Sequence, residues 1–237
     1  MLAKTLFMLE VETLNVDIGP IRILQDASLR IEAGEMVGLI GRNGAGKTTF
    51  LRSLMGLLNA VSGQMKFDDV DLTVLPSQKR AGLGFGYMPE DRKLVPSLTV
   101  EENIMIPVWA VGIEDWEARL EWVYSLIPEA REFRNRPATS LSGGQQKLAA
   151  LARALLVGKR MLLLDEPSEG IAPALAKRMS EILSNLKAEG VTILIAESNT
   201  AHCAGLLDRM YVVERGSVAS AWFRIVTRLI KIFINFA

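Results

Sequence analysis

The chain has 237 residues, a length that suits one compact α/β domain with room for an inserted lobe. Lys+Arg and Asp+Glu are balanced at 27 each, so no net charge draws the protein towards nucleic acid or anionic lipid. A single cysteine, Cys203, excludes an internal disulfide and indicates a reducing compartment. The N-terminus lacks a secretion-signal layout, and no apolar run reaches the roughly 20 residues of a membrane-spanning helix, so we expect a cytoplasmic protein.

The first part of the chain reads as short strands followed by a helix. Residues 6–40 contain turns at "DIGP" and "EAGE" and end in a buried strand, "MVGLI", at 36–40. A glycine-rich turn and an apolar-periodic helix over about 47–58 come next. The segments "SGQMKF" and "GFGYMP" predict two further strands, at 62–67 and 84–89.

The second part alternates between helices and strands. From 91 to 141 the pattern is helical, with interruptions at Pro96, Pro107, Pro128 and Pro137. We therefore expect a helical lobe inserted at about 91–157. The alternation predicts helices over 143–157 and 175–189 and strands over 161–165, 191–196 and 210–213. Strands that alternate with helices predict a mostly parallel sheet whose ligand lies at the carboxyl ends of the strands.

The glycine-rich turn carries a phosphate-binding motif. "GRNGAGKT" fits the pattern G-x-x-x-x-G-K-[ST] and lies between a predicted strand and a predicted helix, which is the context the motif requires. Backbone N–H groups of such a loop cradle phosphate oxygens, and the following helix points its positive end at them. We expect Lys47 to reach the β- and γ-phosphates and Thr48 to hold Mg²⁺; an ordinary glycine turn is the alternative. The expected nucleotide-binding residues are Gly41, Arg42, Asn43, Gly44, Ala45, Gly46, Lys47, Thr48 and Thr49.

The second motif is acidic and ends a buried strand. In "MLLLDEP", Asp165 comes at the end of four apolar residues, where it can fix the water shell of the metal. Glu166 is next and is placed to act as general base on the attacking water. Acidic residues often end strands, so the motif gains its meaning from the phosphate-binding loop upstream.

"LSGGQQK", residues 141–147, identifies a resemblance to a known family, the ATP-binding-cassette (ABC) ATPases, whose signature is LSGGQ. The resemblance implies ATP and Mg²⁺ as ligands and a P-loop NTPase fold. That fold has a RecA-like, mostly parallel core sheet, an N-terminal antiparallel β subdomain and an inserted helical lobe, here a single domain over 1–218. It also implies that four signature residues contact the γ-phosphate held by the opposite subunit: Ser142, Gly143, Gly144 and Gln145. The physical alternative is a simple helix cap, because Ser before two glycines favours a helix start.

The sequence around the motifs narrows the resemblance to one subfamily. Glu90 stands where most ABC proteins have Gln, so the resemblance places it near the metal, and "TVEEN" (99–103) and "SEGIAP" (168–173) follow. The chain is similar to ATPase subunits of branched-chain (hydrophobic) amino-acid importers; urea and short-amide importers are the alternative. The resemblance implies a second ABC ATPase as partner, in a heterodimer with a homodimer possible in isolation. It also implies transmembrane permease subunits and a peripheral position on the cytoplasmic face of the inner or plasma membrane.

Two positions depart from the family pattern at the expected nucleotide site. Ile18 stands where an adenine-stacking aromatic residue is expected, and the loss of stacking, worth about 1 kcal/mol, predicts weaker or less base-selective nucleotide binding. An ordinary strand residue at this position is the alternative. Ser198 occupies the place of the switch histidine. The only histidine, His202, comes four residues later and is expected in the next helix as a surface or packing residue. We expect Ser198 to touch phosphate through a water and hydrolysis to be slow; a catalytically weak regulatory cassette is the alternative.

The last residues also depart from the family. Residues 219–237 form an apolar segment with a narrow basic stripe at Arg224, Arg228 and Lys231. A membrane-surface helix is one interpretation, but a helix packed on the body or an unrelated terminus is favoured, because surface anchors have a broader polar face. A different class of function, an ABC ATPase acting on nucleic acid or ribosomes, is disfavoured by the single cassette without basic patches or heptads.

Overall fold

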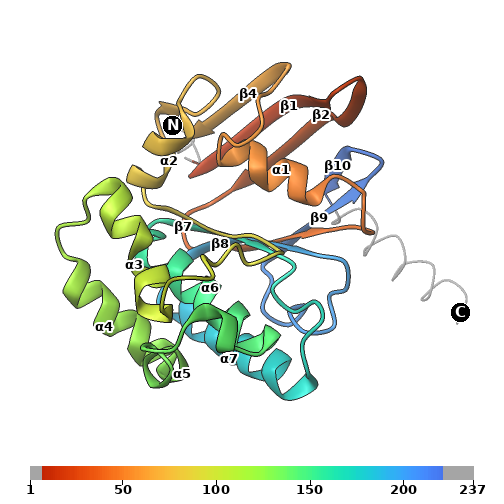
Figure 1. Ribbon diagram of the computed structural model, residues 1–237. Helices are drawn as coiled ribbons and strands as arrows, with labels where there is room; N and C mark the ends of the chain where they lie inside the picture. The colour runs from red at the N-terminus through yellow and green to blue at the C-terminus, as the bar shows by residue number, and fades with distance from the viewer. Residues whose placement is uncertain (1–6, 221–237) are drawn as a thin grey trace, which may run out of the picture.

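The computed structural model describes residues 7–220, which form two sheets with helices between and beneath them (Figure 1). The smaller sheet is antiparallel, with strand order β2-β1-β4-β5. Its strands are β1 Leu9–Ile18, β2 Ile21–Ile31, β4 Ser62–Phe67 and β5 Val70–Asp71. The register pairs Leu9 with Ile31 and Ile18 with Ile21, so β1 and β2 form a hairpin, with shifts in register between Val11 and Asp17. This sheet is the antiparallel β subdomain that the resemblance implied.

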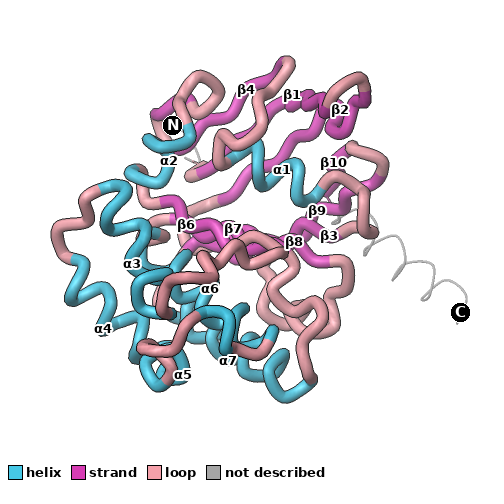
Figure 2. Tube along the Cα trace, viewed as in Figure 1, coloured by secondary structure: helices cyan, strands magenta, loops and turns pink. Residues whose placement is uncertain are grey.

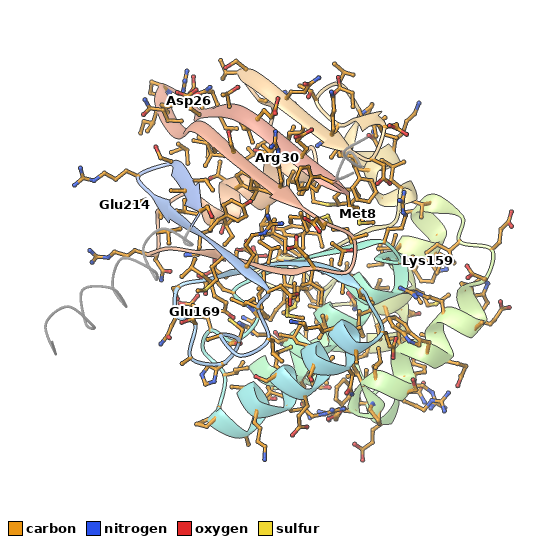
Figure 3. The ribbon with its side chains drawn as sticks, turned by 180° about the vertical axis from the view of Figure 1, so that it is seen from behind. Met8, Asp26, Arg30, Lys159, Glu169 and Glu214 are labelled. Carbon is orange, nitrogen blue, oxygen red and sulfur yellow. The ribbon has the colours of Figure 1, made fainter. Side chains whose placement is uncertain are left out.

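The larger sheet is the core of the domain, with strand order β10-β9-β3-β8-β7-β6. Its strands are β3 Met36–Ile40, β6 Phe85–Met88, β7 Met161–Asp165, β8 Thr192–Glu197, β9 Arg209–Glu214 and β10 Ser217–Ser220. All neighbouring strands are parallel except β9 and β10. Parallel strands place their carboxyl ends along one edge. Glu169, beyond the carboxyl end of β7, accordingly lies on the opposite side of the molecule from Lys159, which precedes β7 (Figure 3).

Helices cover both faces of the core sheet. The helices are α1 Lys47–Leu54, α2 Ser77–Gly82, α3 Val100–Val111, α4 Trp116–Leu126, α5 Pro128–Glu132, α6 Gly143–Val157 and α7 Pro173–Ala188, with a 3₁₀ turn at Ala138–Ser140. Figure 2 shows α1 between the two sheets and α3 to α7 on the far side of the core sheet. Every residue of β7 is buried, since both faces are covered, which explains its continuous apolar run.

The core sheet divides the apolar interior into two clusters. Leu162 and Leu164 of β7 pack with the helical lobe, α6 and α7. Their neighbours Met161 and Leu163 point to the other face and pack with α1 and the antiparallel sheet. This alternation follows from the two-residue period of a strand. The P-loop helix is therefore held from both sides by apolar contacts.

Three sequence expectations about helices were wrong. Pro107 does not break the lobe: α3 runs through it, because the loss of one helical hydrogen bond is offset by buried Ile104 and Val108 on either side. Helix α1 ends at Leu54 rather than 58, since Gly56 adopts a left-handed φ of 69°. Within the described residues no helix follows β8; residues 201–206 form turns, in which only Cys203 is buried and no repeating apolar face exists.

The C-terminal segment 219–237 lies outside the described residues from position 221 onward. Its first two residues belong to β10. In the part of the chain that the structure describes, no helix is both long and apolar enough to cross a membrane.

Candidate functional site

The P-loop leads from β3 into α1 at the carboxyl edge of the core sheet. Gly41 is required by close approach, because a Cβ there would lie 2.4 Å from the backbone oxygen of Val213. Gly46, the N-cap of α1, has a φ of 116°, which L side chains rarely adopt. The loop borders a cavity of about 300 Å³. The residues that line it are Ile23, Asn43, Gly44, Gly46, Lys47, Thr48, Thr49, Glu90 and Glu166.

Lys47 bridges the P-loop and the end of β7. Its side chain is 5% exposed, and its Nζ donates to the carbonyl oxygens of Gly41 at 2.6 Å and Arg42 at 3.2 Å. The same Nζ lies 2.9 Å from Oε1 of Glu166. Within the described residues this oxygen accepts no hydrogen bond of good geometry, so the attraction is mainly ionic. The Lys47 ammonium thus lies between the loop and the carboxylate. An oxygen atom of a bound phosphate would compete with Glu166 for this ammonium.

Asp165 and Thr48 supply neighbouring oxygen atoms. The Thr48 hydroxyl donates to Oδ1 of Asp165 at 3.2 Å, and the Tyr87 hydroxyl donates to Oδ2 at 3.4 Å. The pKa of Asp165 is raised to about 6, mainly by burial and also by the nearby Glu90 carboxylate, although the Thr48 hydrogen bond opposes the shift. Burial likewise raises the pKa of Tyr87.

The donor set fits Mg²⁺ bound together with phosphates. Mg²⁺ prefers hard oxygen ligands and is usually held by one or two carboxylates plus substrate phosphates and water. Thr48 and Asp165 are in direct contact, and Glu90 shares one cavity wall with Thr48. Among the described residues, no group of three His, Cys, Asp or Glu side chains forms a metal site by itself.

Glu166 is surrounded by groups that fix its carboxylate. It is 2% exposed and adopts a left-handed φ of 47°, which is unusual outside glycine. The backbone N–H of Ser198 donates to Glu166 Oε2 at 3.1 Å, and the Ser198 hydroxyl donates to it at 3.3 Å. The sequence suggested a water-mediated phosphate contact for Ser198; the structure instead places its hydroxyl on the predicted base.

A second buried carboxylate, which the sequence reasoning missed, lies beside Glu166. Glu197 ends β8, is 3% exposed and accepts a hydrogen bond from the backbone N–H of Ser168 at 3.1 Å. The pKa of Glu197 is raised to about 7, mainly by burial and also by its contact with Glu166. An acidic residue at the end of an apolar strand was the available signal, but a strand end alone does not show whether a carboxylate is buried.

The signature residues form the start of α6. Ser142 is its N-cap: its hydroxyl accepts from the Gln145 N–H at 3.3 Å, and the Gln145 side chain accepts from the Ser142 N–H at 3.0 Å. This is a capping box, which leaves Ser142 and Gly143 exposed to solvent. The helix-cap interpretation and an anion-binding role are therefore compatible.

Ile18 and His202 lie away from the P-loop cavity. Ile18 is 46% exposed at the β1–β2 turn and is not among the residues that line the cavity, whereas Ile23 of β2 is. His202 is exposed in the turn after β8, where its backbone oxygen accepts from the Ser180 hydroxyl at 2.7 Å. The surface position expected for His202 is confirmed.

Comparison with known proteins decides the family. The family model described as "ABC transporter" matches residues 24–169, which include the P-loop, the signature and the acidic motif at the end of β7. The chain belongs to the ABC transporter family. This ABC protein is an ATP-binding subunit that hydrolyses ATP for transport.

Named relatives of this ABC subunit serve different transporters. It is 37% identical to the high-affinity branched-chain amino acid transport ATP-binding protein BraG of Pseudomonas aeruginosa, over 89% of the chain and 91% of the relative. It is 34% identical to the probable branched-chain amino acid transport ATP-binding protein LivF of Archaeoglobus fulgidus, over 90% of each. It is also 33% identical to the lipopolysaccharide export system ATP-binding protein LptB of Escherichia coli K12, over 82% of each.

The fold of this ABC subunit matches a solved cassette. The ADP conformation of the ATP-binding cassette MJ1267 superimposes with a TM-score of 0.79 and 27% identity, over 91% of this chain and 90% of that one. The ABC fold expected from the sequence is thereby confirmed.

Proposed function

We propose that this ABC subunit powers the import of branched-chain or related amino acids. The observation that carries the proposal is its likeness to BraG over nearly the full length of both chains. The LivF relative supports the same solute class. So does the sequence around Glu90 and at 99–103 and 168–173. Urea or short-amide import shares that wording, and lipopolysaccharide export is a second candidate because LptB matches at 33% identity.

The site supports hydrolysis by a water that Glu166 activates. Bound phosphates draw the Lys47 ammonium away from Glu166, since a more highly charged anion then competes for it. The freed carboxylate is still oriented by the two hydrogen bonds from Ser198. It can take the proton of the attacking water as general base. Mg²⁺, held by Thr48 and Asp165 with Glu90 nearby, would neutralise charge that develops on the phosphates.

The exposed signature supports pairing with a second cassette. Ser142 and Gly143 are open to solvent at a helix N-terminus, which is a ready anion-binding site. We propose that they complete the ATP site of a partner ATPase, in a heterodimer, while the partner's signature completes the site at Lys47. Permease subunits embedded in the membrane would hold this pair at the cytoplasmic face as a peripheral component. The chain would then need no contact with nucleic acid or with the solute itself.

A transport assay tests the solute. Cells that lack this subunit are complemented with the wild-type chain or with Glu166→Gln, and uptake of radiolabelled leucine, isoleucine and urea is measured. We expect leucine and isoleucine uptake to return with the wild type only, because removal of a general base lowers the rate by about 100-fold to 10,000-fold. Restored urea uptake alone would assign the subunit to the amide importers. Uptake that is unchanged throughout, with lipopolysaccharide missing from the cell surface, would assign it to export.

A further inference from the structure

A buried lysine joins the signature helix to the turn that carries Glu166. Lys147 lies in α6, five residues after Ser142, and is 5% exposed. Its Nζ donates to the backbone oxygen of Glu166 at 2.6 Å and to the backbone oxygen of Glu169 at 2.5 Å. Because ammonium donors on carbonyl groups are charge-assisted, these contacts are stronger than ordinary hydrogen bonds.

The two carbonyl groups are the ends of one tight turn. The Glu169 N–H donates to the backbone oxygen of Glu166 at 3.2 Å, so Lys147 donates to the first and the last residue of the turn 166–169. Within that turn Glu166 holds its left-handed φ, a conformation that persists only when neighbouring groups impose it. The Glu169 side chain also accepts from Asn43 of the P-loop at 3.5 Å. The position of the turn thus depends on a side chain from α6.

The N-terminus of α6, the helix that carries Lys147, faces outward. Ser142 and Gly143 are exposed at the N-terminus of α6, whereas Lys147 is buried one turn further along. An α-helix is stiff over so short a distance, so a movement of its first turn is passed to Lys147. Burial lowers the pKa of Lys147, but the carboxylates of Glu197 and Glu169 oppose that shift.

We propose that Lys147 is a positioning residue that couples the two ATP sites of the paired transporter. ATP bound by the partner against Ser142 would seat α6, and Lys147 would then set the turn that aims Glu166 at the ATP of its own P-loop. The inference rests on the proposed pairing and on the proposed role of Glu166. Its chemical basis is a single ammonium shared by two backbone carbonyl groups.

The test compares Lys147→Met with a matched control in the transporter complex isolated through a tag on this subunit. Arg119→Met is the control, because Arg119 also donates to a backbone oxygen of α6, that of Leu155, but far from the turn. ATP affinity, steady-state Mg²⁺-ATP hydrolysis, the Hill coefficient for ATP, and hydrogen exchange of residues 166–169 are measured for each. Glu166→Gln is measured alongside.

For Lys147→Met we expect ATP affinity within about twofold of wild type and a rate lower by about 100-fold, the scale of a small misplacement of a catalytic group. The Hill coefficient falls towards unity, and amide exchange in the turn becomes faster, while Arg119→Met matches wild type. If Lys147→Met does not fold, Lys147→Gln replaces it, since its amide can still donate to one carbonyl; it should lose cooperativity at unchanged ATP affinity.

Two results overturn the inference and are distinguishable. In the first, the Lys147 variants have the same rates and Hill coefficients as Arg119→Met, while Glu166→Gln is inactive. This result refutes the role of Lys147 and leaves the role of Glu166 intact. Full hydrolysis by Glu166→Gln refutes the proposed general base, and the inference falls with it.

Discussion

Replacement of Glu197 by Gln should stabilise the nucleotide-free protein at alkaline pH. Glu197 is 3% exposed, and its pKa is raised from an ordinary 4.5 to about 7, mainly by burial and also by its contact with Glu166. The folded protein therefore binds more protons than the unfolded chain between these two values. The free energy of unfolding of the wild type falls as the pH rises through that window.

The magnitude follows from the size of the shift. Each pKa unit corresponds to about 1.4 kcal/mol, so full ionisation of Glu197 costs at most about 3.5 kcal/mol. Gln has no charge to bury, keeps an oxygen that accepts the Ser168 N–H and can donate to Glu166. The advantage of Glu197→Gln should therefore be below about 1 kcal/mol at pH 5 and about 3 kcal/mol at pH 8.

Urea unfolding followed by tryptophan fluorescence at pH 5 and pH 8, with EDTA and no nucleotide, measures both values. Glu117→Gln, an exposed change on α4, serves as control and should stay within about 0.5 kcal/mol at both pH values. If Glu197→Gln has the same advantage at pH 5 as at pH 8, or destabilises at pH 8, the burial of an ionisable carboxylate at this position is refuted.

Three further changes test other parts of the structure. Gly41→Ala should destabilise by about 1–3 kcal/mol in urea unfolding, since its Cβ would lie 2.4 Å from the Val213 oxygen; unchanged stability would mean that the P-loop is looser than described. Ile18→Tyr should leave ATP affinity within about twofold of wild type in equilibrium dialysis, because position 18 lies at the β1–β2 turn and does not line the P-loop cavity; a gain of about fivefold would place adenine beside that turn. Thr99→Ala should lower stability by about 1 kcal/mol, because it removes the hydroxyl that caps α3 with Glu102; no loss would show that the capping box is dispensable.

The sequence located elements best where a continuous apolar run or a motif marks their ends. The bounds of β3, β7 and α6 match the expected 36–40, 161–165 and 143–157, because a continuous apolar run or a serine–glycine helix start marks each of them. Rules that depend only on neighbouring residues failed where tertiary packing decides whether a helix continues. Pro107 stays inside α3 since the apolar residues around it are buried, a fact that only the folded lobe supplies.

The candidate site shows the same division. Lys47, Thr48, Asp165 and Glu166 were found from motifs, and the structure brings all four together. The surroundings of Glu166 were not foreseen, because they come from distant segments: Ser198 from the loop after β8, and Lys147 from a helix that precedes β7. Spacing along the chain carries no information about such contacts.

The central place of β3 in its sheet has a consequence for synthesis on the ribosome. β3 leads into the P-loop at Gly41, but its partners are β8 and β9, which end at Glu197 and Glu214. At about 5–20 residues per second, the P-loop strand therefore waits on the order of ten to thirty seconds before either edge can be paired. During this interval the hairpin β1–β2 can form, whereas an apolar strand and its glycine loop stay open to other chains. A nascent chain stalled before β8 would hold all residues of the phosphate-binding motif without the sheet that shapes them.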